Sequence, residues 1–179
     1  MPNTFNICLV PSDSFAQELI EYSNLLSARS ESRFVLGQAS IPHATVLQFS
    51  TKESPIAVID SFNKLLVTKK LSLDLAGLTL LPGDDGDLWC EIAVLKSSAL
   101  QSLQSGVIAE MQPSILEIKN AVHDKFRPHF TVALGKISDL NSALHPSLLP
   151  KQLIRASGVD CVLRVGVSGE NFQVTSLLE

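Results

Sequence analysis

The chain has 179 residues, of which 45% are hydrophobic and 18% charged, and its formal net charge is −4. This length and hydrophobic content suit a single folded domain over residues 1–179 and exclude a largely disordered chain. The acidic balance excludes a protein that holds long duplex nucleic acid, because such proteins are usually basic. If the chain handles nucleic acid, we expect it to bind a small nucleotide or an RNA end.

The cysteines and the apolar segments indicate the compartment. Three cysteines, far apart and in no metal-like spacing, are typical of reduced thiols in a cytoplasmic protein; they are Cys8, Cys90 and Cys161. The first six residues lack the basic stretch and apolar core of a signal peptide. The most apolar region, Leu65–Leu81, is interrupted by lysines and an aspartate, so it is not a membrane span. We expect a cytoplasmic monomer that makes no membrane contact.

The chain opens with a predicted strand and a predicted helix. Phe5–Pro11 is a short apolar run typical of a strand. From Ser14 onward, apolar residues recur at spacings of three and four, which predicts a helix. Ser14 and Gln17 have the form of a capping box at its start.

Two more strands and a second helix follow. Arg33–Gln38 and His43–Phe49 are predicted strands. Ser54 followed by Pro55 is typical of a helix start, since serine caps the free N–H groups and proline fits the first turn. The predicted apolar stripe of this helix consists of Ile56, Ile59, Phe62 and Leu66.

A hairpin is predicted in the middle of the chain. Leucines alternate with other residues from Leu71 to Leu80, and the alternation slips by one at Ala76–Gly77, which indicates a β-bulge. Pro82–Asp87 is rich in turn residues, and Leu88–Leu95 returns as a strand.

The second half predicts two helices, a strand and a final hairpin. The helices start at Ser98, capped with Gln101, and near Ser114, and His129–Leu134 is a strand. Residues 138–154 are predicted to be irregular or short-helical. The last hairpin pairs 159–167 with 172–178. Hairpins imply antiparallel pairing, so we predict an α+β fold.

A short motif is repeated along the chain. Pro42–Val46 (PHATV) and Pro128–Val132 (PHFTV) match at four of five positions. Residues i and i+2 of a strand share one face, so each histidine shares a face with the threonine that follows it. The residues between them, and the final valine, turn toward the core. Two such strands side by side would place two imidazoles and two hydroxyls in one cleft.

These groups suit chemistry at phosphorus. An imidazole titrates near neutrality, so one can accept a proton from an attacking water while the other protonates a departing oxygen. Threonine hydroxyls can donate hydrogen bonds to the non-bridging oxygens, where charge accumulates. We therefore predict that His43 and His129 are catalytic and that Thr45 and Thr131 bind phosphate. We expect no metal and no cofactor.

The two motifs resemble the paired H-x-[ST]-x signature of the 2H phosphoesterase superfamily, which includes LigT-type RNA cyclic phosphodiesterases and plant-type cyclic nucleotide phosphodiesterases. The resemblance implies one domain of two intertwined, pseudo-symmetric lobes. Two antiparallel-rich sheets would flank a central cleft, with helices outside. It also implies metal-independent hydrolysis of a 2′,3′-cyclic phosphate, or a related cyclic phosphate, on a nucleotide or an RNA end. A 2′-5′ RNA ligase or phosphodiesterase is a close alternative.

Two other residues are candidates for substrate binding. Arg127 precedes the second motif and can reach a phosphate, although a solvated strand-end arginine is an equal alternative. Trp89 shares a strand face with Glu91 and can stack on a base. The two remaining histidines, His123 and His145, lie outside the repeat and are expected to be non-catalytic.

Two functions of other classes remain open. One is a module that binds a nucleotide or an RNA end without turnover. The other is a zinc protein that uses His43, His129 and Cys90, although this alternative gives the motif threonines no role. Asp84, Asp85 and Asp87 resemble a calcium loop only loosely, and the glycines among them favour a hairpin turn.

Overall fold

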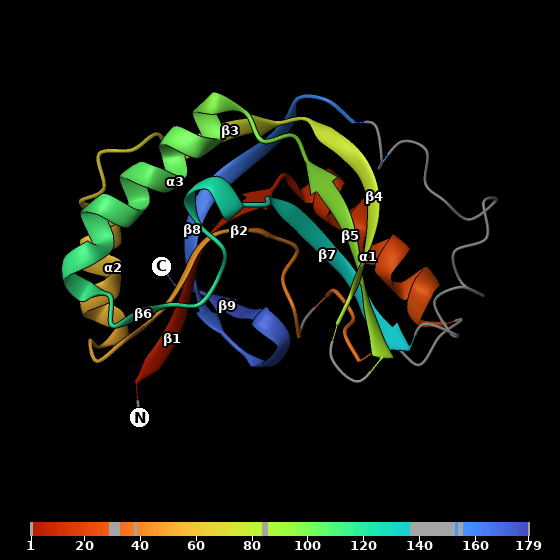
Figure 1. Ribbon diagram of the computed structural model, residues 1–179, viewed down its shortest axis with the longest axis horizontal. Helices are drawn as coiled ribbons and strands as arrows, with labels where there is room; N and C mark the ends of the chain where they lie inside the picture. Colours follow the sequence, from red (N-terminus) through yellow and green to blue (C-terminus); the bar gives the residue numbers. More distant parts are fainter. Residues whose placement is uncertain are drawn as a thin grey trace.

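The computed structural model describes residues 2–28, 33–37, 39–83, 86–136, 153 and 156–178. Within these residues the chain is an α+β fold with one nine-stranded sheet and three helices (Figure 1). The strands are β1 (Asn3–Pro11), β2 (Ala44–Thr51), β3 (Lys70–Leu73), β4 (Leu75–Pro82), β5 (Asp87–Val94), β6 (Glu117–Ile118), β7 (His129–Lys136), β8 (Val159–Ser168) and β9 (Val174–Leu177). The helices are α1 (Asp13–Ser27), α2 (Pro55–Asn63) and α3 (Ser98–Met111).

The sheet is continuous, in the order β3-β8-β1-β2-β7-β5-β4, with β6 added to β2 and β9 added to β8. Every pair of these strands is antiparallel. The two motif strands, β2 and β7, meet at the centre through a single residue pair, Ala44 opposite Phe130. The α+β class is therefore confirmed, whereas the prediction of two separate sheets is corrected. The motif strands pair with each other and so join what the sequence suggested as two sheets.

The sheet curves, because consecutive strands lie at its opposite edges. β3 pairs with β8 at one edge, and β4 pairs with β5 at the other. Only Asp74 separates Leu73 from Leu75, so the two edges come together at that point. The predicted slip in the leucine alternation is confirmed as a register shift between Leu75 and Gly77.

The helices cross over between the two halves of the sheet. α1 follows β1 but packs against β7, where the Phe15 and Phe130 rings lie 5.8 Å apart in an edge-on arrangement. α3 follows β5 but packs against β2, where Gln104 donates a hydrogen bond to the Val46 carbonyl at 2.9 Å. Figure 1 shows α2 and α3 beside the β1–β2 half and α1 beside the β5–β7 half. Each motif strand is thus held by a helix that belongs to the other half of the chain.

Of the three helices, α2 starts where the sequence predicted, and α1 and α3 each start one residue or more away from the predicted cap. Ser54 caps α2 as predicted, accepting a hydrogen bond from the Ala57 N–H at 3.3 Å. α3 is capped by Ser97, one residue before the predicted Ser98. The prediction of a capping box at Ser14 is wrong, because α1 begins at Asp13 and its N-cap residue is Ser12.

The predicted stripe of α2 is only partly correct. Phe62 is buried, but Ile56 and Leu66 are 71% and 93% exposed. Val58 is fully buried in their place, so the helix is rotated from the predicted face. Its short length of nine residues gives the apolar period too few turns to fix the buried face.

The predicted helix from Ser114 is wrong. This segment contains β6, flanked by two 3-10 turns at Gln112–Ser114 and His123–Lys125. Backbone pairing overrides its helical period, because Ile118 pairs with Phe49 on β2. The strand predicted at Arg33–Gln38 is reduced to isolated bridges, one of which joins Phe34 to Leu134. Residue 38 and most of 138–154 lie outside the described residues.

The strand of the second motif and the final hairpin of β8 and β9 are confirmed. The middle hairpin is confirmed only from Leu75 onward, where β4 pairs with β5, because Leu71–Leu73 belongs to β3, which pairs with β8. All three cysteines are buried free thiols. No helix in the described part of the chain is long and apolar enough to cross a membrane.

Candidate active site

The two motif strands carry the same irregularity at the same motif position. On β2, Thr45 lies opposite Cys8, and the register then shifts so that Val46 has no opposite residue. On β7, Thr131 lies opposite Glu91, and Val132 is skipped in the same way. A bulge of this kind re-aims the side chains around it. The sequence repeat is therefore a repeat of backbone geometry.

The two imidazoles are fixed by the same hydrogen bond. The Nδ1 atom of His43 lies 2.7 Å from the Ile41 carbonyl, and that of His129 lies 2.8 Å from the Arg127 carbonyl. A carbonyl oxygen only accepts, so each Nδ1 carries a proton and donates it. The proton on Nε2 is then the one that can change during a reaction.

The structure brings the predicted site residues together around one cavity of about 350 Å³. All six predicted residues line it: His43, Thr45, Trp89, Arg127, His129 and Thr131. Both motif histidines and both motif threonines therefore line the same cavity. The cavity volume lies within the range of sites that bind small molecules.

Thr45 has a buried partner that the sequence did not reveal. Asn6 on β1 is fully buried and donates a hydrogen bond from its side-chain nitrogen to the Thr45 Oγ1 at 2.9 Å. Because this hydroxyl oxygen accepts from Asn6, its proton remains available to an oxygen in the cavity. An asparagine in an otherwise apolar strand was the only signal for this residue.

Glu91 is the second residue for which the sequence analysis assigned no role. Its carboxylate, 4% exposed, forms a two-pronged ion pair with the Arg127 guanidinium. Its Oε1 also lies 3.2 Å from the Nε2 of His129. Arg127 is therefore held in place by Glu91, while its side chain stays half-exposed. The available signal was the position of Glu91 on the same strand face as Trp89.

The surroundings lower the pKa of both imidazoles, but the groups that oppose this shift differ between the two. Burial lowers the pKa of His43 to about 4, opposed by the hydrogen bond to Ile41, and nearby His129 lowers it further. Burial also lowers the pKa of His129, but here the Glu91 carboxylate opposes the shift. The Arg127 carbonyl also raises the pKa of His129, while the guanidinium lowers it.

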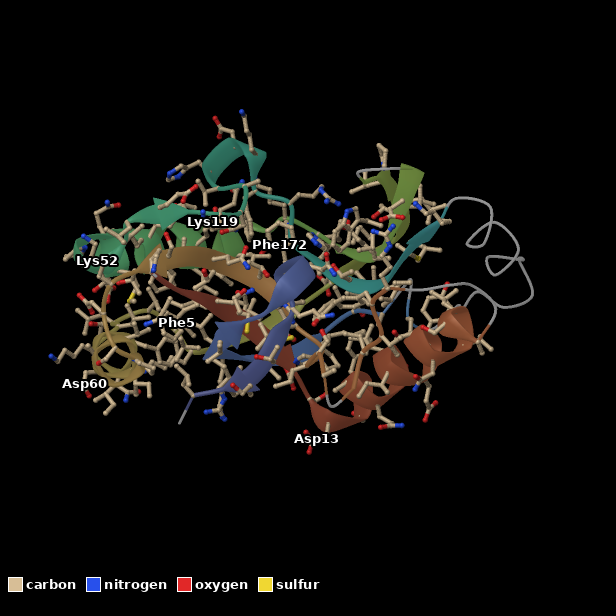
Figure 2. All side chains as sticks on the ribbon, turned by 90° about the horizontal axis from the view of Figure 1, so that it is seen from below. Phe5, Asp13, Lys52, Asp60, Lys119 and Phe172 are labelled. Carbon is tan, nitrogen blue, oxygen red and sulfur yellow. The ribbon has the colours of Figure 1, made fainter. Side chains whose placement is uncertain are left out.

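The rim of the cavity combines aromatic and basic side chains. The rings of Trp89 and Phe172 lie 6.3 Å apart, and both residues line the cavity. Phe172 is 54% exposed and has a φ of 61°, which is unusual for a bulky side chain. Lys119 and Lys125 also line the cavity. Figure 2 shows Lys119 and Phe172 toward the same side of the molecule, opposite Asp13.

The geometry does not support the zinc alternative. Cys90 is fully buried, and it belongs to the opposite face of β5 from Trp89 and Glu91. Among the described residues, no group of three or more histidine, cysteine, aspartate and glutamate side chains is arranged to hold a metal ion. His123 is exposed and does not line the cavity. His145 and most of the acidic turn, Asp84 and Asp85, lie outside the described residues.

Solved structures with the same fold were found. Kluyveromyces marxianus Usb1 matches with a TM-score of 0.51 at 12% identity, over 98% of this chain and 95% of that chain. A phosphoesterase crystal structure matches with a TM-score of 0.55 at 12% identity, over 100% and 97%. Usb1 with uridine monophosphate matches with a TM-score of 0.51 at 10% identity, over 98% and 97%.

This chain shares its fold with Usb1 and with a phosphoesterase. No protein-family model and no curated protein matches its sequence. At these low identities the likeness concerns the fold, and it spans nearly the whole length of each chain. The fold shared with a phosphoesterase is consistent with the resemblance that the two motifs predicted.

Proposed function

We propose that this protein is a metal-independent phosphodiesterase of the 2H type. It hydrolyses a 2′,3′-cyclic phosphate, or a related cyclic phosphate, on a nucleotide or an RNA end. One observation carries the proposal: two strands with the same bulge and the same Nδ1 hydrogen bond bring His43, Thr45, His129 and Thr131 to one cavity. Such a duplicated arrangement suits a reaction with one proton acceptor and one proton donor.

The proposed reaction is an in-line displacement at phosphorus. One imidazole accepts a proton from the attacking water, and the other gives a proton to the sugar oxygen that leaves. The hydroxyls of Thr45 and Thr131 donate hydrogen bonds to the non-bridging oxygens, where negative charge grows in the transition state. Each proton transfer typically contributes about 10²–10⁴-fold to the rate.

The rim supports a nucleotide or an RNA terminus as the substrate. Trp89 and Phe172 offer aromatic faces on which a base can stack, and Lys119 and Lys125 offer positive charge for further phosphates. Arg127 uses two of its five N–H donors on Glu91, so others remain for the substrate. The match to Usb1 with uridine monophosphate agrees with a nucleotide ligand. A cavity of this size and a net charge of −4 do not suit a long duplex.

Turnover in a chelator tests the proposal. We would incubate the protein with EDTA and 2′,3′-cyclic nucleotides, ADP-ribose 1″,2″-cyclic phosphate, RNA with a cyclic-phosphate end and a 2′-5′-linked dinucleotide. His43→Ala and His129→Ala are the test variants. His123→Asn is the matched control, because this histidine lies outside the cavity and asparagine tolerates its positive φ of 55°.

Three outcomes separate the candidate functions. Turnover in EDTA that both alanine variants lose and the control keeps supports the two-histidine phosphodiesterase and ranks its substrates. Preference for the 2′-5′-linked dinucleotide favours the ligase-like alternative. Tight binding of a nucleotide without turnover of any substrate favours the binding module and overturns the enzyme proposal.

A further inference from the structure

The cavity is lined by a carboxylate, although a negative charge repels the phosphate that this site is proposed to bind. Glu91 is the only acidic residue among the described residues that line the cavity. It is nearly inaccessible to solvent, so its charge must be balanced by protein groups. It lies between two groups that can carry positive charge, the Arg127 guanidinium and the His129 imidazole.

The contacts of His129 favour a second proton on its ring, in opposition to the burial that lowers its pKa. Its Nδ1 lies 2.8 Å from the Arg127 carbonyl, and its Nε2 lies 3.2 Å from the Glu91 carboxylate. The Arg127 carbonyl accepts the Nδ1 proton, and the negative charge of ionised Glu91 beside Nε2 favours a second proton there. His43 differs, because its Nδ1 contacts the Ile41 carbonyl and its Nε2 has no acceptor among the described residues. The neutral form of His43 already satisfies its contacts.

The register of the strands gives this difference a structural origin. Glu91 lies opposite Thr131 of the second motif, and the matching position opposite Thr45 of the first motif holds Cys8. Burial raises the pKa of the Cys8 thiol to about 12, so this group is uncharged at neutral pH. One motif strand therefore faces a negative charge and the other faces none.

The other charged groups around the cavity do not duplicate the effect of Glu91. Arg127, just before β7, is positive and lowers the pKa of His129, and Lys119 and Lys125, on the connection from β6, add only positive charge to the cavity lining. The neighbouring His43 repels an imidazolium when it is itself charged. Among the side chains that the structure describes near Phe172, those that line the cavity, Asn171 and Phe172 itself, are uncharged.

We propose that Glu91 is a positioning residue that keeps a proton on the Nε2 of His129, which makes His129 the general acid and His43 the general base. The role assignment rests on the proposed function, while the proton position can be tested without it. The 3.2 Å contact is an ion-pair distance and does not add to the hydrogen bonds of the site, so the Nε2 proton can be donated to an oxygen in the cavity.

With these roles, each proton that is released in the reaction has an acceptor. Water attacks phosphorus and passes one proton to the Nε2 of His43 while the new P–O bond forms. The P–O bond to one sugar oxygen breaks, and that oxygen takes the Nε2 proton of His129. Exchange with solvent then removes the proton from His43 and returns one to His129, which Glu91 favours.

The test is a titration of the histidine rings by NMR without any substrate. The chain has four histidines, so the ring signals can be assigned with single variants. We expect His129 to protonate at a higher pH than His43 in the unmodified protein. Glu91→Gln keeps the size of the side chain but removes its charge, and it should move the His129 titration to lower pH.

Asp87→Asn is the matched control. Asp87 is also a buried carboxylate on β5, but it pairs with Arg33 and Lys136 and does not line the cavity. This control should leave the His129 titration in place. An unchanged His129 titration in Glu91→Gln overturns the proposal. If that variant does not fold, the unmodified protein still decides, because a His43 titration above that of His129 also overturns it.

Activity supplies a separate readout. A general acid must be protonated, so in Glu91→Gln the fall in kcat/KM at rising pH should begin at lower pH. We expect roughly a tenfold loss above neutrality, since one pKa unit corresponds to a factor of ten. A uniform loss across the pH range would indicate a merely structural role. If no variant turns over any cyclic phosphate, the proposed function fails, and the NMR titration still decides the role of Glu91.

Discussion

The two motif strands, β2 and β7, are alike in backbone and different in charge. Both carry a histidine whose Nδ1 is bonded to the carbonyl two residues before it, and both bulge at the motif valine. They differ in the residue opposite the threonine, which is Cys8 on one side and Glu91 on the other. The motif therefore fixes where the imidazoles are, and the neighbouring strand decides which of them holds a second proton, on Nε2.

This comparison explains how a duplicated motif can perform an asymmetric reaction. Hydrolysis needs one group that accepts a proton and one that donates it, so the two imidazoles must differ in protonation when the reaction starts. A single buried carboxylate outside the motif is enough to distinguish them, because an opposite charge nearby favours the charged form of an imidazole.

The largest effect is expected when either of the two histidines, His43 or His129, is replaced. His43→Gln and His129→Gln should each lower kcat by about 10²–10⁴-fold, because each loses one proton transfer. Glutamine keeps a polar group of similar length, so binding of the nucleotide should survive. Steady-state kinetics check kcat, and a binding assay with a non-hydrolysed nucleotide checks affinity. Equal activity of either variant and the unmodified protein would contradict the account.

The threonines should give the next largest effect. Thr45→Val and Thr131→Val keep the shape of the side chain but remove the donor to the phosphate oxygens, and each should lower kcat by roughly 10²-fold. The loss should fall on kcat more than on KM, since the charge on the oxygens grows in the transition state. A change in KM alone would mean that the hydroxyls only bind the ground state.

Burial of neutral His43 should make the protein less stable at acid pH. Its folded pKa of about 4 lies below the unfolded value of about 6.5, so below pH 6.5 the unfolded chain takes up a proton that the folded protein excludes. The free energy of unfolding should therefore fall as pH decreases from 6.5 to 4, by about 3 kcal/mol for this residue. Urea unfolding at several pH values should show a flatter profile in His43→Gln, and an unchanged slope would contradict the burial of a neutral ring.

The smallest expected effect is at the rim. Trp89→Leu should raise KM for a nucleotide about tenfold and leave kcat nearly unchanged, because stacking of one base typically contributes about 1–3 kcal/mol. Leu80→Ala, on the neighbouring strand β4 at a 42% exposed position outside the cavity, is a control for the loss of an apolar side chain. Equal KM values for Trp89→Leu and the control would exclude stacking on Trp89.

The sequence predicted the parts of the site that depend on local pattern. Each of these patterns spans only a few residues. They are the two PHxTV segments, the turns of the hairpins and the alternation that placed Trp89 beside Glu91, and the structure agrees with them. The pairing of β2 with β7 follows from none of these patterns, because it joins residues more than 80 positions apart along the chain.

The missed features depend on contacts between distant segments. Asn6 acquires its role only because β1 lies beside β2, and Glu91 only because β5 lies beside β7. The segment after Ser114 has a helical period, yet it forms a strand because an edge of β2 is available to it. The division of one leucine-rich run between β3 and β4 likewise depends on strands elsewhere in the chain.

The most direct test of the two-histidine mechanism compares single and double variants on one substrate. We would measure kcat/KM for a 2′,3′-cyclic nucleotide in EDTA with the unmodified protein, His43→Ala, His129→Ala and the double variant. Groups that act as a unit are strongly non-additive, so the double variant should be about as inactive as either single variant. Full activity in either single variant, or losses that multiply in the double variant, would contradict the account.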